Sequence, residues 1–454
     1  MFPNILFITI DNIRADKFNK NSSCKIPALT NLINNGVIFR QAISGSDGTA
    51  IGLSNIFTGN YSIRSGTKTY TFKKNFFTYF DELQKNGFHT YCCIPDLQYL
   101  KHVTSKFNDI EIYPYVDRSL YTDLFNGLGS KILQKLKSSR KQPWLIYTHL
   151  MDAKPPFTLP TEFDQEKYGE TKTDRILSAI DFWIEKFMHE IDLTNTLVII
   201  SSDHGNFIPD DEKGLNYMPT RLTNVLKSGK NIPIPNSIKD RLYVTARKVS
   251  RFSNKENLRN LDQYKMRSFE TRTKTELFDE LIRIPLIFSG IGIKSNDISD
   301  QVRQIDIFPT IFDLIGLKSI NEVQGRSLLS LLKGKTMDEL PAFIENSILI
   351  EKNAAGSKKE GNFIGIRTSN FKYQRSRNSK DRFVSLYNLV NDPKELKNLA
   401  EKSSENAQKL YEMEQILHDI ISEDNKKTSI SDNDDLSKSE QELVKEELRK
   451  LGYI

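Results

Sequence analysis

The stretch Asn4-Ile5-Leu6-Phe7-Ile8-Thr9-Ile10, followed directly by Asp11-Asn12-Ile13-Arg14, decides the expected fold. A short apolar run rich in β-branched residues and ended by polar ones predicts a buried strand over Ile5–Ile10. Similar runs recur at Thr90–Ile94, Trp144–Leu150, Leu197–Ser201 and Ile284–Phe288. Helical patterns separate them at Pro27–Asn35, Phe76–Lys85, Thr173–Glu190 and Gln304–Ile315. This alternation predicts an α/β protein with a mostly parallel central sheet flanked by helices.

The pattern changes near residue 341, so we expect a catalytic α/β unit over 1–340 and a smaller C-terminal α+β subdomain over 341–421. Short strands are predicted in the subdomain at Ser347–Glu351, Phe363–Arg367, Lys372–Arg375 and Arg382–Leu389. A helix is predicted over 400–421. Residues 422–454 are predicted to form a polar linker and a charged terminal helix at Ser437–Leu451.

The composition excludes disordered and fibrous classes, since 38% of the 454 residues are hydrophobic and 27% are charged. The formal charge of +6 is too small to indicate a nucleic-acid partner, and we expect none. Three cysteines, Cys24, Cys92 and Cys93, cannot build a disulfide framework, which favours a reducing compartment. Neither a leader peptide nor an apolar run long enough to span a membrane is visible, so we predict a cytoplasmic protein.

Residues 206–273 interrupt the alternation and form a basic insertion. They contain 14 Lys and Arg against 7 Asp and Glu, a net charge of +7. One interpretation is a solvated surface insertion. The other is a lid or platform that attracts an anionic polymer, a nucleotide-linked substrate or a membrane surface, and peripheral membrane contact is part of that prediction.

Two predicted strands end in groups that bind metal ions. Asp11 and Asn12 follow the first strand, and Asp203 and His204 follow Leu197–Ser201. In an open α/β sheet, ligands bind beyond the carboxyl ends of the strands. Carboxylate, amide and imidazole groups together favour zinc, manganese or iron over calcium. The Asp11-Asn12 pair alone is also typical of a turn or a helix cap.

A glycine-rich loop between these pairs runs from Ser44 to Gly59 and enters a short helix near Thr49. A helix N-terminus offers free amides to an oxyanion. Thr49 is therefore either a capping residue or a nucleophile whose hydroxyl is acidified by a metal. The spacing alone does not choose between these roles.

Taken together, these segments resemble the sulfatase family of the alkaline-phosphatase superfamily. The likeness includes the Asp11-Asn12-Ile13-Arg14 end, the loop closing at Thr58-Gly59, and Ser202-Asp203-His204-Gly205. It extends through His149–Phe157, Lys274–Phe288, Leu386–Glu395 and Leu451-Gly452-Tyr453. The resemblance covers nearly the whole chain and implies an alkaline-phosphatase-like fold.

The resemblance implies that Asp11, Asn12, Asp203 and His204, together with Thr49, surround one divalent metal ion, with manganese or zinc favoured over calcium. Asn12 stands where sulfatases usually have a second Asp. Lys274 matches the lysine that holds the non-bridging oxygens of the substrate. Lys154 replaces the histidine that assists the leaving group, and His149 is either a substitute for that histidine or simply a strand residue.

The nucleophile position departs from the sulfatase pattern. Thr49 stands where the family has the Cys or Ser that is oxidised to formylglycine, and Ile51 and Leu53 replace the family's Pro and Arg. Threonine resembles instead the nucleophile of the superfamily's phosphoethanolamine and phosphoglycerol transferases. The resemblance thus favours a metal-dependent hydrolase or transferase that acts on phosphate monoesters or diesters.

Two alternatives stay open from the sequence. One is a sulfatase that acts on sulfated sugars without formylglycine, and the other is an inactive module that binds an anionic glycan. In each case the expected partner is a small-molecule, glycan or lipid-linked anionic ester. The oligomeric state does not follow from the sequence.

Overall fold

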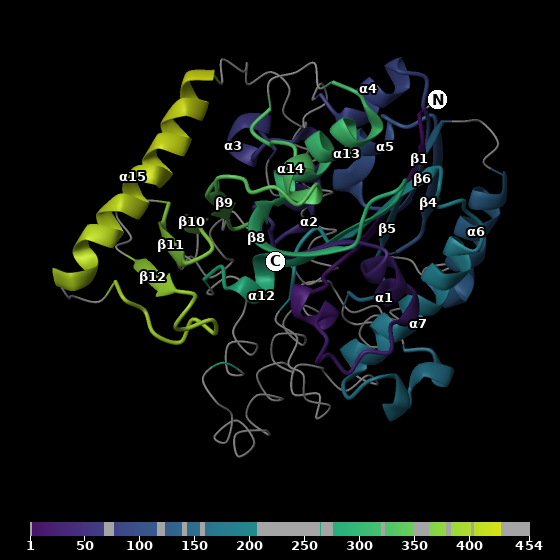
Figure 1. Cartoon of the computed structure of the whole chain (residues 1–454), viewed down its shortest axis with the longest axis horizontal. Coiled ribbons are helices and arrows are strands. Elements are labelled where there is room, and N and C mark those ends of the chain that lie inside the picture. The colour runs from purple at the N-terminus through teal and green to yellow at the C-terminus, as the bar shows by residue number, and fades with distance from the viewer. Residues whose placement is uncertain are drawn as a thin grey trace, which may run out of the picture.

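The computed structural model describes residues 2–67, 77–115, 123–138, 143–154, 159–206, 264, 276–318, 323–347, 363–377, 383–400 and 404–427. These residues confirm the predicted α/β architecture, with a large sheet between helices and a small antiparallel sheet to one side (Figure 1). Apart from Asn206 and Tyr264, the basic insertion lies outside the described residues. The predicted terminal helix at Ser437–Leu451 also lies outside them.

The central sheet has eight strands in the order β4-β3-β5-β1-β6-β7-β2-β8. Their bounds are β1 Asn4–Ile10, β2 Gly36–Ile43, β3 His89–Pro95, β4 Asp109–Tyr113, β5 Trp144–Leu150, β6 Thr196–Ser201, β7 Arg283–Gly290 and β8 Asn296–Arg303. All five predicted strands are present, whereas β2, β4 and β8 were not predicted. β7 runs antiparallel to β6 and β2, and the other pairings are parallel, so the sheet is mostly parallel.

Helices cover both faces of this sheet (Figure 1). One group is α1 (Pro27–Asn34), α6 (Gly129–Ser138) and α7 (Lys172–Met188), and the other is α2 (Thr49–Thr58), α4 (Tyr79–Lys85) and α13 (Ile307–Ile315). Short helices connect the strands at α3 Ser62–Ser65, α5 Lys101–Thr104, α12 Asp279–Ile282 and α14 Leu329–Leu332.

Capping residues explain where two helices depart from their predicted bounds. The helix predicted from Phe76 begins at Tyr79 because Thr78 and Asp81 form a reciprocal capping box. The helix predicted over Thr173–Glu190 spans Lys172–Met188, and Thr171 and Asp174 cap it in the same way. In the segment predicted as Gln304–Ile315, a 3-10 turn over Gln304–Asp306 precedes α13.

The C-terminal sheet is antiparallel, with the order β12-β11-β10-β9. Its strands are β9 Ala342–Glu345, β10 Phe363–Arg367, β11 Phe371–Ser376 and β12 Val384–Asn388, and α15 (Ser404–Lys427) packs on β10 and β11. β9, which pairs with β10, was not predicted, and of the strand predicted at Ser347–Glu351 the structure describes Ser347 alone. Residues 348–351 lie outside the described part.

Strand register brings three strand ends together. Ile10 lies beside Leu150, and Thr9 lies beside Ser201, so β1, β5 and β6 finish at one edge of the sheet. The hydrophobic core beneath them includes Phe57 and Tyr147, whose ring centroids are 5.0 Å apart. Within the described residues, no helix has the length and apolar character needed to cross a bilayer.

Candidate active site

The ends of β1 and β6 place two buried carboxylates next to each other. Asp11 continues the ladder, since its N–H donates to the carbonyl of Leu150 at 2.8 Å. The chain then turns at Asn12, which has a φ of 72°, a left-handed conformation that asparagine tolerates. This turn lets the Asn12 N–H donate to Asp203 Oδ1 at 3.4 Å. Both carboxylates are fully buried.

Two residues that were not predicted from the sequence, Ser44 and Gln304, hold the backbone of Asp203 in place. Its carbonyl oxygen accepts hydrogen bonds from Ser44 Oγ and from Gln304 Nε2, both at 2.8 Å. A Cβ atom on Gly52 would lie 2.4 Å from the same oxygen, so α2 packs directly on this segment. No local motif marks Ser44 or Gln304, because their role depends on contacts between distant segments.

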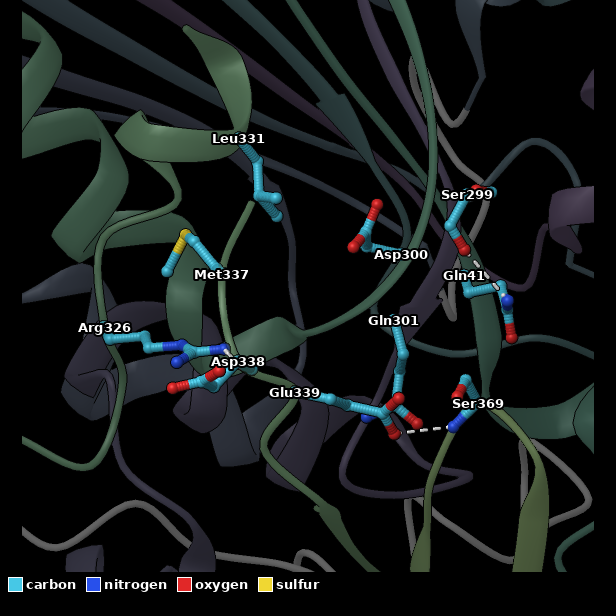
Figure 2. Close-up of a pocket in the computed structure, with 10 residues that line it drawn as sticks. All are labelled: Gln41, Ser299, Asp300, Gln301, Arg326, Leu331, Met337, Asp338, Glu339 and Ser369. Atoms are coloured by element: carbon cyan, nitrogen blue, oxygen red, sulfur yellow. Dashed lines mark hydrogen bonds between the residues drawn. The ribbon is translucent and has the colours of Figure 1, made fainter. Parts of the chain in front are cut away.

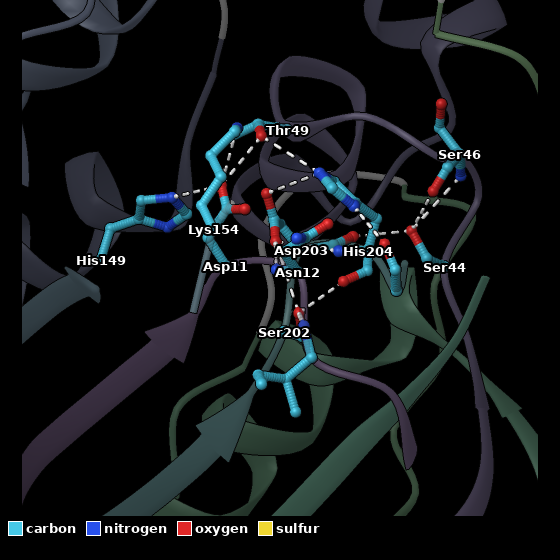
Figure 3. A network of polar contacts seen from close by, with 12 residues as sticks. Asp11, Asn12, Ser44, Ser46, Thr49, His149, Lys154, Ser202, Asp203 and His204 are labelled. Atoms are coloured by element: carbon cyan, nitrogen blue, oxygen red, sulfur yellow. Dashed lines mark hydrogen bonds and ion pairs between the residues drawn. The ribbon is translucent and has the colours of Figure 1, made fainter. Parts of the chain in front are cut away.

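Thr49 is the first residue of α2, and its hydroxyl reaches the strand ends (Figure 3). Thr49 Oγ1 donates to Asp11 Oδ2 at 3.2 Å and lies 3.3 Å from His204 Nε2. His204 Nδ1 lies 2.7 Å from the Gly205 carbonyl oxygen, which requires the ring proton on Nδ1. Nε2 is therefore the ring nitrogen that faces Thr49.

Lys154 and His149 complete the group around Asp11. Lys154 Nζ donates to Asp11 Oδ2 at 3.3 Å, and His149 Nε2 lies 3.5 Å from the same oxygen. His149 is fully buried on β5, with Nδ1 3.4 Å from Tyr147 Oη. Because it lies beside Asp11 inside the sheet, its position favours a role at the carboxylate over contact with a leaving group.

The electrostatics keep Asp11 ionised. Burial opposes its ionisation, but the charge of Lys154, the contact with His149 and the nearby His204 hold the pKa of Asp11 well below its usual range. Asp152, close along the chain, behaves differently. Burial raises the pKa of Asp152 to about 7, although its carboxyl accepts a hydrogen bond from the Leu124 N–H.

These residues could hold a divalent metal ion. Ligand atoms of Asp11, His149 and Asp203 all lie within 4.8 Å of one another. Within the described residues, Asp11 Oδ1 and Asp203 Oδ2 are buried without a hydrogen-bond partner, which is costly unless a cation binds there. His204 Nε2 lies 3.5 Å from Asp203 Oδ2. The mixture of carboxylate and imidazole suits manganese or zinc.

The structure thus gathers most of the predicted site residues: Asp11, Asn12, Thr49, His149, Lys154, Asp203 and His204 (Figure 3). Lys274 lies outside the described residues. Ile51 and Leu53, where the sulfatase pattern has Pro and Arg, are packed inside the protein at 3% and 1% exposure.

A separate cavity of about 300 Å³ lies where β2 and β8 meet the C-terminal sheet (Figure 2). Its polar lining is already engaged, since Gln301 Nε2 donates to the Leu340 carbonyl at 3.0 Å and Glu339 accepts from the Ser369 N–H at 2.6 Å. It has no histidine, and it contains none of the predicted site residues. The candidate active site is therefore the strand-end cluster.

The chain is similar to known proteins in sequence and in fold. Residues 3–317 match the family model described as sulfatase, and residues 267–423 match the one described as N-sulphoglucosamine sulphohydrolase, C-terminal. Arylsulfatase K of Gallus gallus is 30% identical over 149 residues, which are 33% of this chain and 27% of that protein. This match therefore covers about a quarter of that relative's length.

Solved structures share the fold over nearly the whole chain. The phosphonate monoester hydrolase of Agrobacterium radiobacter has a TM-score of 0.63 at 16% identity, covering 93% of this chain and 96% of that one. A protein solved with its substrate D-glucosamine-2-N,6-O-disulfate has a TM-score of 0.64 at 16% identity, covering 94% and 99%. At these identities the likeness shows the fold alone.

Proposed function

This chain belongs to the sulfatase family, and we propose that it is a metal-dependent hydrolase or transferase that cleaves phosphate monoesters or diesters through Thr49. The observation that carries the proposal is the position of the Thr49 hydroxyl, in contact with both Asp11 and His204. This hydroxyl lies at a helix N-terminus, beside two carboxylates that each have one oxygen without a hydrogen-bond partner among the described residues. That is an arranged setting for a nucleophile.

Asp11, Asp203 and His204 would hold the metal ion, with Asn12 and His149 beside them. When bound, a divalent ion lowers the pKa of a neighbouring hydroxyl and neutralises charge on a transferred group. Asp11 Oδ2 accepts the Thr49 hydrogen bond and so orients the hydroxyl and offers its proton an acceptor. His204 Nε2 lies on the other side of the hydroxyl, 3.3 Å from Thr49 Oγ1.

The proposed reaction has two steps. Thr49 Oγ forms a bond to phosphorus in line with the ester oxygen, which leaves with the electron pair of the broken bond. Lys154, whose Nζ lies beside the Asp11 carboxylate, neutralises charge on the equatorial oxygens of the phosphoryl group. Lys274 is proposed for the same task. Water or an acceptor alcohol then takes the phosphoryl group from Thr49 and regenerates the hydroxyl.

Sulfate ester hydrolysis is the second candidate, and the family match favours it. Sulfate and phosphate esters are nearly isosteric, so a site of this shape accepts either. The threonine at the nucleophile position and the lysine at position 154 favour the more highly charged phosphate. A sulfatase here would have to work without formylglycine.

We propose a small-molecule or glycan-linked anionic ester as the substrate.

The net charge of +7 in residues 206–273 supports attraction of a polyanionic or membrane-bound partner. Tyr264, in this stretch, accepts a hydrogen bond from Arg14 Nη2 at 3.3 Å, three residues beyond Asp11. Sedimentation with anionic vesicles at low salt tests the membrane form of this idea, and absence of binding would count against it. The cytoplasmic location stays a prediction from the sequence.

The test is turnover by purified protein loaded in turn with manganese, zinc, calcium and magnesium. The substrates are an aryl monophosphate, a phosphodiester, a phosphonate monoester and a sulfate ester. We expect cleavage of phosphorus esters with manganese or zinc, loss of turnover in Thr49→Ala, and partial retention in the matched Thr49→Ser. Cleavage of sulfate alone would support the second candidate, and unchanged turnover by Thr49→Ala would sink the threonine mechanism.

A further inference from the structure

The loop that precedes Thr49 is held by the end of β9, about 300 residues later in the chain. The Glu345 N–H donates to the Gly45 carbonyl oxygen at 2.9 Å, and Ser46 forms a parallel bridge with Glu345. The Ser347 N–H donates to Asp47 Oδ1 at 2.7 Å. Asp47 is only 1% exposed. Backbone and side-chain contacts therefore join the loop to the C-terminal sheet.

Gly48 shows how closely these segments approach. A Cβ atom at Gly48 would lie 2.3 Å from both Cβ and Oγ of Ser347. The backbone at Gly48 is extended, with φ of −142° and ψ of 149°, which alanine adopts without strain. The glycine is thus required by the neighbouring segment and not by its own conformation.

The end of β9 is itself anchored on two sides. The Glu345 carboxylate accepts a hydrogen bond from Ser62 Oγ on α3, and it also accepts one from Arg377 Nη2 at 2.5 Å. Ser62 belongs to the helix that follows α2, and Arg377 follows β11. The strand end that contacts the loop is therefore fixed to the catalytic unit and to the C-terminal sheet at once.

We propose that Asp47 is a positioning residue for Thr49, and that its hydrogen bond to Ser347 sets where the Thr49 hydroxyl lies relative to Asp11 and His204. This inference rests on the proposed function of Thr49. Asp47 does not touch the reacting atoms in the proposed reaction. A displacement of a nucleophile by about 1 Å is enough to reduce turnover about 10²-fold.

Three substitutions at Asp47 separate its geometry from its charge. Asp47→Asn keeps an acceptor oxygen at the same place, and we expect kcat within a few-fold of the parent. Asp47→Glu keeps the charge but moves the carboxylate, and Asp47→Ala removes the acceptor; for both we expect kcat to fall about 10²-fold with little change in KM. If Asp47→Ala does not fold, the Asn and Glu variants still decide the question. A kcat for Asp47→Asn as low as that for Asp47→Glu would overturn the proposal.

A steric pair of variants tests the same contact without removing a polar group. Gly48→Ala should displace the loop from Ser347 and reduce kcat, and the double variant Gly48→Ala/Ser347→Gly should restore it, because the clashing atoms are gone. Failure of the second substitution to restore kcat would contradict the proposal. Glu339→Ala is the matched control, since Glu339 accepts from the Ser369 N–H far from the site, and its kcat should not change.

Manganese content and Thr49→Ala separate this inference from the proposed function. The Asp47 and Gly48 variants should bind as much manganese as the parent, because neither residue is a proposed ligand. If Thr49→Ala abolishes turnover and Asp47→Ala does not lower it, the positioning role is wrong and the nucleophile stands. If Thr49→Ala turns over normally, the proposed function itself fails.

Discussion

Two clusters of buried charge differ in how their charges are paired. At the candidate active site, Asp11 and Asp203 are fully buried, and each has a carboxylate oxygen without a hydrogen-bond partner among the described residues. A second cluster joins α12 to the C-terminal sheet, where Asp279 and Glu395 face Arg367 and Lys372. In that cluster two acidic groups meet two basic ones.

The difference separates a structural cluster from a functional one. Arg367 Nη2 lies 2.9 Å from Asp279 Oδ2, and Lys372 contacts both Asp279 and Glu395, so each carboxyl group of this junction contacts a described Lys or Arg. At the site, Lys154 is the one Lys or Arg with a described ion pair to Asp11. Because a buried unpaired carboxylate is unfavourable, the incomplete cluster is the one expected to take up a cation.

The largest expected effect comes from removing charge at the incomplete cluster. Asp203→Asn keeps the acceptor for the His204 N–H but lowers the negative charge facing the proposed metal. We expect turnover to fall on the order of 10³-fold, while the metal-free protein keeps its stability. Steady-state kinetics and thermal unfolding check both. A metal-free protein much less stable than the parent would mean that this cluster, too, is structural.

In the cluster of Asp279, Glu395, Arg367 and Lys372, loss of a charge should lower the stability of the protein. Lys372→Met leaves Asp279 and Glu395 buried without one of their two cations, and we expect a loss of about 3–5 kcal/mol in unfolding free energy. The double variant Lys372→Met/Glu395→Leu should recover much of that loss, because it removes one positive and one negative charge together. Urea unfolding measures each value, and equal stabilities for the two variants would show that the pairing is unimportant.

Stabilisation by added metal should distinguish the two clusters. Manganese at about 100 times its dissociation constant should stabilise the parent by about 2.7 kcal/mol. Asp203→Asn should lose this gain, whereas Lys372→Met should keep it. Unfolding curves with manganese and with chelator provide the measurement. Stabilisation that persists in Asp203→Asn would place the ion elsewhere.

A smaller effect concerns Asp152, another buried carboxyl with an oxygen that has no hydrogen-bond partner in the described structure. Because burial raises its pKa to about 7, the folded state holds a proton that the unfolded state has already released. Unfolding free energy should therefore fall as pH rises, by roughly 2 kcal/mol between about pH 5 and 7. Asp152→Asn, which keeps the acceptor for Leu124, should flatten this slope.

Asp192→Asn is the control for that slope. Hydrogen bonds from Thr194 lower the pKa of the Asp192 carboxyl, so it titrates below this range and its replacement should leave the slope unchanged. An unchanged slope in Asp152→Asn would show that other groups set the pH dependence.

Much of the fold could be predicted because the central strands are continuous apolar runs. β1, β5 and β6 are buried at every position, which makes them visible in the sequence. β8 was missed because Asn296–Arg303 is an edge strand with exposed polar residues. The antiparallel direction of β7 depends on how the chain returns to the sheet, and no local pattern encodes it.

In the candidate site, too, some residues could be predicted from the sequence and some contacts could not. Asp11, Thr49, Asp203 and His204 were predictable since they follow strands or begin a helix. The contact of His149 with Asp11 follows from strand register, in which His149 lies beside Thr9. The contact between Asp47 and Ser347 joins residues 300 positions apart and needed the structure.

The packing of α2 bears on which residues positions 49, 51 and 53 could accept. Every residue from Thr49 to Thr58 is buried, and Leu53 is 1% exposed. The formylglycine motif of the sulfatase pattern would require Cys or Ser at 49, Pro at 51 and Arg at 53, and the arginine would bring a charge into the core. Three substitutions and a repacking of α2 therefore separate this chain from that pattern.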